Sequence, residues 1–328
     1  ADAKSAGIII LNECGLDPGI DHMSAMRVID HIHHKGGKVQ EFYSLCGALP
    51  APECNDNLFG YKFSWSPKGV VLASSSSALY LKHGKTIEIP TENLFKDRFS
   101  IFDFPTVGEM EVYPNRNSMD YVQIYGIPEA ETVYRGTLRF PHWCEIMDAI
   151  KACNLITQDK FDFTGKSYAD MVAMMLGTDS HNIKQKVAAQ ANVAVDAPAI
   201  CGMEWLGLFS EAKMNRTQDS PFEVIAELMI QKMPLAHNER DMNVMLHIFR
   251  AVYPDGTQEI IKSKLLDFGS PATETSIARN VTLPVSVAVQ LILNGKINLT
   301  GVYRPTIPQL YNPILDGLEA YGIKMEET

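Results

Sequence analysis

The segment GLDPGID, Gly15 to Asp21, constrains the fold of this chain more than any other. It joins an apolar run, Ile8 to Leu11, to a helical pattern of apolar residues from Pro18 to Lys35. This order predicts a strand-to-helix junction that carries two carboxylates. Open α/β sheets bind their ligands at such junctions, so the junction is the first candidate for a functional site.

The residues before the junction predict that the chain opens inside an α/β unit. Ala1 to Ala6 has the pattern of the last turns of a helix, and Gly7 suits the left-handed position that closes one. We therefore expect a piece of a larger protein. With 328 residues, 46% of them hydrophobic, the chain is long enough for two domains.

Charge and composition argue against several classes of protein. The net charge is −10 and no run of Lys or Arg occurs, so the chain would repel a nucleic-acid backbone. No stretch reaches the roughly 18 uninterrupted apolar residues of a membrane span, and the N-terminus lacks the order of a signal peptide. The six cysteines form no CxxC pair. We expect no nucleic-acid or membrane partner, no disulfide and no metal site.

Hydrophobic patterns up to residue 140 predict a mixed sheet with long loops. The predicted strands are 8–13, 38–46, 86–90, 99–104, 109–113 and 131–140, and the predicted helices are 18–35 and 66–82. In the last strand, Arg135, Thr137 and Arg139 alternate with Tyr134 and Leu138. This alternation predicts one cationic and one apolar face.

Beyond Pro141 the pattern becomes helical and then returns to the sheet. The predicted helices are 142–155, 167–177, 180–192, 198–209 and 220–232. Pro-Asp-Gly at 254–256 predicts a hairpin between strands 243–252 and 257–268. Helices 272–294 and 308–321 finish the chain, the first kinked or broken at Pro284. The predicted fold class is α/β, a mixed β-sheet domain with an inserted all-helical domain.

Familiar catalytic motifs are absent, so any activity must come from another arrangement of side chains. The sequence contains no GxG, GxxxxGK, HExxH or GxSxG. Asp17 directly precedes Pro18, which suits either a helix N-cap or a catalytic carboxylate. Glu13, at the end of the preceding strand, must find a partner or water. Together Glu13 and Asp17 form a candidate acid/base pair.

Arg116, Arg135 and Arg139 lie within 24 residues of one another. The planar guanidinium binds carboxylates through two hydrogen bonds, so the cluster suits a ligand with several carboxyl groups. A solvated or salt-bridged sheet face is the structural alternative.

Three further residues, Lys62, Ser64 and Trp65, either line the same cleft or fold a loop over the core. Cys46 follows an apolar strand, where a lone cysteine is usually a small buried hydrophobe. His22 comes one turn after the junction and is interpreted as structural.

Five longer segments carry a resemblance to a known family. They are, in order, NECGLDPGIDHMSAM, SLCGALPAPE, LFGYKFSWSPKGV, YPNRNSMDYVQIYGI and RGTLRF. Together they resemble the glutamate-forming saccharopine dehydrogenases, called saccharopine reductases in fungi. The resemblance covers nearly the whole chain and is weaker between about 145 and 240.

The resemblance implies an activity and a set of site residues. Members interconvert saccharopine with glutamate and 2-aminoadipate 6-semialdehyde in lysine metabolism, by hydride transfer with NAD or NADP. It places Asp17 and Cys46 beside the secondary amine of the substrate, with Asp17 preferred to Glu13 as the proton acceptor. The predicted substrate-binding residues are Arg116, Asn115, Arg135, Thr137, Arg139, Lys62, Ser64 and Trp65.

Complete members begin with a Rossmann domain that bears a GxGxxG turn. The resemblance implies that only its last βα unit, Gly7 to Lys35, is present, so Leu16 and Asp17 would touch the cofactor only peripherally. We therefore expect no turnover from this chain alone. The implied domains are a Rossmann remnant at 1–36, a substrate-binding domain at 37–140 and 241–328, and a helical domain at 141–240.

Two other functions fit the same residues. One is a binding module that senses an amino-dicarboxylate without redox chemistry, and the other is a dehydrogenase of another imino acid. Apolar surface meant for the missing cofactor domain would favour a homodimer. The expected location is cytoplasmic, or mitochondrial if the chain comes from a bifunctional animal-type enzyme.

Overall fold

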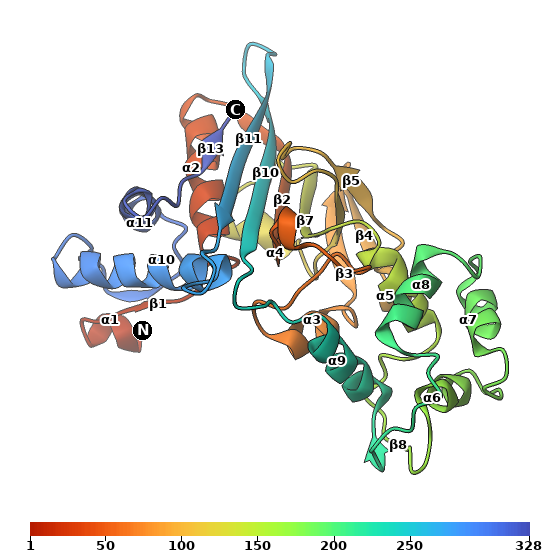
Figure 1. The fold of residues 1–328 in the computed structure, drawn as a ribbon. Helices are drawn as coiled ribbons and strands as arrows, with labels where there is room; N and C mark the ends of the chain where they lie inside the picture. Colours follow the sequence, from red (N-terminus) through yellow and green to blue (C-terminus); the bar gives the residue numbers. More distant parts are fainter.

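The computed structural model describes all 328 residues and is built around a nine-stranded sheet (Figure 1). Its strands are β2 (Lys38–Pro50), β3 (Ala78–Lys82), β4 (Lys85–Ile89), β5 (Phe99–Ile101), β6 (Met110–Pro114), β7 (Thr132–Arg139), β10 (Asp241–Val252), β11 (Gln258–Phe268) and β13 (Glu326–Glu327). The order is β13-β11-β10-β2-β7-β3-β4, and β6 joins β5 to β7. Only β2 and β7 run parallel, which confirms the predicted mixed sheet.

Two small sheets stand apart from the large one. The strands β1 (Ile9–Leu11) and β12 (Gly301–Tyr303) pair in parallel, although nearly the whole chain separates them. The strands β8 (Phe161–Asp162) and β9 (Gln218–Asp219) pair within the helical region. The sequence patterns do not predict β12, β8 or β9, because runs of two or three residues carry no period.

Helices cover both faces of the large sheet. They are α1 (Asp2–Ser5), α2 (Ile20–His34), α3 (Pro67–Ala73), α4 (Asp120–Ile124), α5 (Trp143–Ala152), α6 (Tyr168–Met175), α7 (Ile183–Ala191), α8 (Pro198–Leu206), α9 (Pro221–Lys232), α10 (Ser276–Leu293) and α11 (Pro308–Glu319), with 3₁₀ turns η1 (Pro52–Cys54) and η2 (Thr91–Asn93). Figure 1 shows α2, α10 and α11 on one side and α5 to α9 on the other.

The alternation of the central strands separates two hydrophobic cores. Phe42 on β2 and Met245 on β10 pack with α2, α10 and α11. Their neighbours Leu45 and Val244 face the opposite way and share a core with α5, α8 and α9. Helices α5 to α9 therefore join the sheet in one continuous core, and their status as a separate domain stays a prediction.

Two local predictions are wrong, and a third is decided only in part. The predicted helix 66–82 ends at Ala73, and residues 78–82 form β3, because Ala78 and Tyr80 alternate as buried residues in the sheet. Helix α10 runs through Pro284 without a break, and a kink there stays a prediction. Asp17 is not an N-cap, because α2 begins at Ile20 with Gly19 in that position.

Helix α10 carries an exposed apolar stripe beside the small parallel sheet. Every fourth side chain along the helix is apolar and exposed, as are side chains of β1, of the residue before β1, and of β12. These residues are Val281, Val285, Val289, Leu293, Ile8, Ile10 and Val302. By length and composition alone, α10 is also long and apolar enough to cross a membrane. It packs against β10 and α11 in this fold.

Candidate functional site

On the face that carries α2, the middle of the large sheet is only partly covered, and we call this partly exposed region the cleft. Cys46 and Ala48 on β2 and Thr137 on β7 are partly exposed, although both strands have neighbours on each side. We call these three residues the cleft floor. Register partners point to the same face, so Arg135 lies beside Ser44, and Thr137 lies beside Cys46. The predicted cationic face of β7 therefore forms part of this cleft.

The strand-to-helix junction reaches over this face because of a tight loop. The amide of Gly15 donates to the carbonyl of Pro18 over 3.1 Å. Gly19 has φ +152°, and a Cβ there would lie 2.0 Å from the carbonyl oxygen of Gly15. Only glycine fits this position. The loop directs Asp17 toward β7, and Asp21 accepts a 2.5 Å hydrogen bond from the amide of Gly19.

Arg135 joins two junction carboxylates and a tyrosine. It forms an ion pair with Asp17 and lies 3.3 Å from Asp21, and its other nitrogen donates to the hydroxyl of Tyr121 over 2.7 Å. Burial raises the pKa of Asp17 to about 6, with the carboxylate of Asp21 acting in the same direction and Arg135 against it. Burial also opposes ionisation of Asp21, but His22 and Arg135 outweigh it and lower its pKa. Asp21 thus stays charged, while Asp17 can exchange a proton near neutral pH.

The thiol of Cys46 lies on the cleft floor between the charged groups. Burial raises its pKa well above the usual range, and the carboxylates of Asp17 and Asp21 add to this effect. Cys46 is therefore a neutral thiol in this environment, able to donate or accept a weak hydrogen bond.

Glu13 anchors a second chain of hydrogen bonds. Its backbone is left-handed at φ +54°, and its carboxylate lies 2.8 Å from Nε2 of the buried His22 and 2.7 Å from Nε of Arg304. The other ring nitrogen of His22 lies 2.9 Å from the hydroxyl of Tyr125. Burial tends to raise the pKa of Glu13, but the hydrogen bonds from Arg304 and His22 lower it overall. The structure thus favours Asp17 over Glu13 as a proton acceptor.

Arg139 is a buried cation without a carboxylate partner. Its side chain is 4% exposed, and its one hydrogen bond is donated to the carbonyl of Leu138 over 2.8 Å. The guanidinium lies over the rings of Tyr61 and Trp143, at 5.0 and 5.2 Å, and its Nε has no partner. A buried charge normally has a counterion, so this site suits the carboxylate of a ligand.

The aromatic segment before α3 is tied to the protein itself. Lys62 forms ion pairs with Glu239 and, at 2.9 Å, with Asp56. The indole of Trp65 donates to the hydroxyl of Tyr61 over 3.1 Å. The predicted role of Lys62 in substrate binding thus competes with two protein carboxylates, whereas Trp65 stands beside the ring that covers Arg139.

The remaining predicted site residues differ in what surrounds them. The amide of Asn115 donates to the carbonyl of Arg135 over 2.8 Å. Arg116 follows with a left-handed φ of +50°, and its exposed guanidinium makes no hydrogen bond or ion pair within the chain. The hydroxyl of Ser64 is buried without a hydrogen-bond partner. Leu16 is packed in the core, so only its backbone could touch a cofactor.

Sequence patterns do not identify Tyr121, Tyr125 and Arg304 as site residues. Tyr121 and Tyr125 are four residues apart, the spacing of one helix face, and this was the only local signal available. Arg304 follows β12, so its place beside Glu13 depends on the pairing of β12 with β1. No group of three or more His, Cys, Asp or Glu side chains is arranged to hold a metal.

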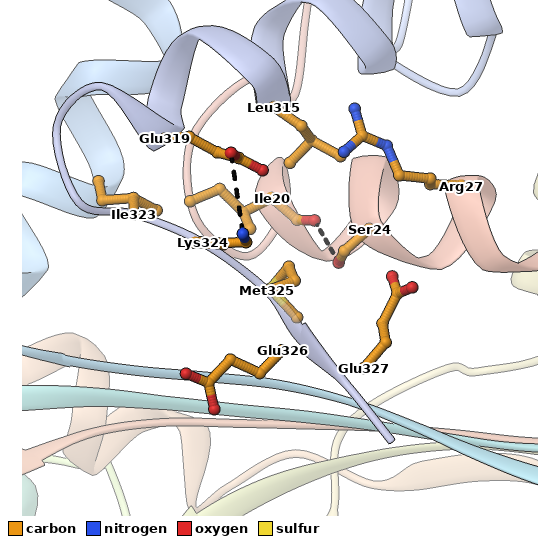
Figure 2. A pocket seen from close by; sticks show the side chains of 10 residues that line it. All are labelled: Ile20, Ser24, Arg27, Leu315, Glu319, Ile323, Lys324, Met325, Glu326 and Glu327. Atoms are coloured by element: carbon orange, nitrogen blue, oxygen red, sulfur yellow. Dashed lines mark hydrogen bonds and ion pairs between the residues drawn. The ribbon is translucent and has the colours of Figure 1, made fainter.

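A separate cavity of about 460 Å³ lies between α2, α11 and the C-terminal residues (Figure 2). Ser24 and Arg27 of α2 line it, and its two cations, Arg27 and Lys324, are paired with carboxylates of the chain. Arg27 lies 2.7 Å from Asp316, and Lys324 lies 4.0 Å from Glu319. None of the junction carboxylates reaches this cavity, so it is not the site of the chemistry.

Comparisons with known proteins identify the family of the chain. The family description "Saccharopine dehydrogenase C-terminal domain" matches residues 15–323. Saccharopine dehydrogenase [NADP(+), L-glutamate-forming] of Saccharomyces cerevisiae is 38% identical over 98% of this chain and 74% of its own length. The mitochondrial alpha-aminoadipic semialdehyde synthase of Bos taurus is 33% identical over 98% of this chain but only 35% of its own. The solved apo saccharopine dehydrogenase (L-Glu forming) from Saccharomyces cerevisiae matches with a TM-score of 0.91 and 37% identity, over 100% of this chain and 75% of that one.

Proposed function

The chain belongs to the saccharopine dehydrogenase family of oxidoreductases in lysine metabolism, and on this premise we propose that its cleft binds saccharopine. The proposed reaction is the nicotinamide-linked interconversion of saccharopine with L-glutamate and 2-aminoadipate 6-semialdehyde at a C–N bond. The observation that carries the proposal is the buried, unpaired Arg139 on the same sheet face as Asp17 and Cys46.

In this proposal each side chain of the site has a separate role. Asp17 takes a proton from the secondary amine and releases it to solvent, since its pKa of about 6 suits exchange near neutral pH. The restored carboxylate then takes a proton from the attacking water and gives it to the nitrogen that leaves as the amine of glutamate. Asp21 and Arg135 hold Asp17 in place from opposite sides. Cys46 contacts the amine as a neutral thiol, and Arg139 binds one carboxylate of the substrate. The exposed Arg116 is free to bind another.

Only part of a binding site for NAD or NADP is formed by this chain, at the carboxyl ends of the parallel strands β1 and β12. Those ends carry Glu13 and Arg304 and open toward the junction, which is where such sheets bind a dinucleotide. A bound nicotinamide would supply the hydride chemistry of the reaction. The residues of this chain offer a peripheral contact through Leu16 and Asp17, because the sequence has no GxGxxG turn for the phosphates.

We further propose that a nucleotide-binding domain covers the apolar stripe of α10 and the exposed side chains of β1 and β12. Val285, Val289 and Ile10 are each more than two-fifths exposed, as is unusual for adjoining aliphatic residues of a globular protein. This chain alone should then bind substrate without turnover. A homodimer through the same face is the competing outcome, and light scattering of the purified chain distinguishes the two.

Isothermal titration of saccharopine into the chain tests the proposed function. We expect binding that is at least about tenfold weaker for glutamate, which has two carboxylates instead of three, and that falls at least about hundredfold in Arg139→Met. Equal binding of both ligands, unaffected by the substitution, would point to a general amino-dicarboxylate module. No saccharopine binding at all would contradict the proposal.

A further inference from the structure

The side-chain oxygen of Asn243 is, like Nε of Arg139, a buried polar atom without a hydrogen-bond partner. Asn243 is fully buried on β10, and its Nδ2 donates to the hydroxyl of Ser276 over 2.9 Å. That hydroxyl in turn donates to the carboxylate of Asp267, Oγ to Oδ2 being 2.6 Å. A hydroxyl has one proton, so Ser276 must accept from Asn243, which fixes the orientation of the amide. The amide oxygen, Oδ1, is left buried and without a donor.

Strand register places this oxygen across the cleft floor from Arg139. Asn243 pairs with Ala48, and the parallel ladder pairs Cys46 with Thr137. The same register, continued by two residues along β2 and β7, places Ala48 beside Arg139. The three residues form a row across neighbouring strands on one face, in which a small, partly exposed alanine separates an unpaired cation from an unpaired acceptor.

We propose that Asn243 Oδ1 and Arg139 together bind the free α-amino-acid end of the substrate over Ala48, the ammonium at Asn243 and its carboxylate at Arg139. This inference rests on the proposed function and names the specificity determinant of that site. Both groups are buried, so leaving either unpaired is costly, and an α-amino acid supplies the complementary ion to each.

The spacing along β2 suits the rest of saccharopine. Cys46 lies two residues from Ala48 on β2, which is about 7 Å along a strand. Four methylene groups separate the α-carbon from the secondary amine in saccharopine, a comparable length when extended. An amino-acid head over Ala48 therefore brings the secondary amine to Cys46 and Asp17. Asp241, fully buried one alternation before Asn243, also lies at this end, but its two oxygens already accept hydrogen bonds from the amides of Ser276 and Ile277.

The test compares saccharopine with an analogue that lacks only the primary amine, N-(5-carboxypentyl)glutamate. Dissociation constants are measured by isothermal titration for the unmodified chain, Asn243→Leu and Asn243→Asp. We expect Asn243→Leu to weaken saccharopine binding about tenfold or more and to leave the analogue unchanged. Asn243→Asp keeps an acceptor oxygen and should keep the preference for saccharopine.

Asn280→Leu is the matched control, because Asn280 is also a fully buried asparagine whose Oδ1 has no partner, but it lies on α10, outside the row of Asn243, Ala48 and Arg139. It should not change the ratio of the two affinities, and thermal melting checks that each variant is folded. Equal losses for both ligands in Asn243→Leu, or loss of the preference in a folded Asn243→Asp, would overturn the assignment of Asn243. Failure of the unmodified chain to bind either ligand would instead overturn the proposed function, and this inference with it.

Discussion

The guanidinium of Arg135 forms an ion pair with Asp17, which lies 118 positions earlier in the chain. This contact attaches the junction loop to β7 and leaves Asp17 partly buried beside one cation, Arg135, and one carboxylate, Asp21. Burial still dominates and keeps the pKa of Asp17 near 6. Asp17 can therefore exchange a proton near neutral pH. Its ionised form lowers the stability of the folded chain, because burial disfavours the charge.

Asp17→Asn should therefore stabilise the chain above pH 6. The pKa of Asp17 is raised from 3.8 to about 6, so the folded state holds the proton more tightly than the unfolded state. Stability consequently falls as the pH rises from about 4 to 6, by at most about 3 kcal/mol. Asparagine cannot ionise and escapes this loss. Thermal melts at pH 3.5 and pH 7.5 should show that the advantage of Asp17→Asn grows with pH.

Asp170→Asn is a control for which the effect on stability should depend on pH in the opposite direction. Asp170 completes the capping box of α6, and hydrogen bonds from Ser167 lower its pKa. Its stabilising effect is present above the ordinary pKa of 3.8 and disappears as the pH falls below it. The Asp170→Asn variant should be less stable at pH 7.5 and approach the unmodified chain in acid. A pH-independent difference for Asp17→Asn would contradict the assignment of its pKa.

Arg139→Met should separate stability from binding. The unpaired guanidinium is desolvated between aromatic rings, so an apolar side chain of similar length should leave the midpoint of urea unfolding unchanged or higher. Saccharopine binding should fall at least about hundredfold in the same protein. A large loss of stability would show instead that the cation is needed to hold Tyr61 and Trp143.

Lys62→Met should lower the stability of the chain and change saccharopine binding little. Lys62 is 7% exposed in its side chain and is held by two carboxylates, of which Glu239 is 16% exposed. Its removal leaves a mostly buried charge without a partner and should cost about 1–3 kcal/mol in urea unfolding. Saccharopine affinity should change much less than in Arg139→Met. A stable Lys62→Met chain that no longer binds saccharopine would instead support direct contact between Lys62 and the substrate.

Gly19→Ala should disrupt the junction. A Cβ at Gly19 meets the backbone of Gly15 at 2.0 Å, and the φ of +152° is open to glycine alone. We expect a loss of at least about 3 kcal/mol in urea unfolding. Gly84→Ala is the comparison, since Gly84 also has a positive φ but nothing lies within 4 Å of its Cβ position. That substitution should cost about 1 kcal/mol.

Local pattern accounts for the parts of the fold that were predicted. The alternation in residues 132–139 and the Pro-Asp-Gly turn at 254–256 belong to β7 and to the β10–β11 hairpin, whose side chains carry a period of two. Residues 78–82 have the same period, but the predicted helix 66–82 crossed them, because the serines between α3 and β3 were not recognised as a break.

Local patterns predict most strands of the large sheet, the junction loop and the cationic face of β7, because each depends on residues close together in the chain. The fold alone brings Asp17 to Arg135, leaves Arg139 without a counterion and puts Asn243 in the same row as Arg139. It also decided the place of Arg304 beside Glu13. These relationships depend on strand order and register between distant segments, and a local pattern carries no information about which distant partner a side chain will meet.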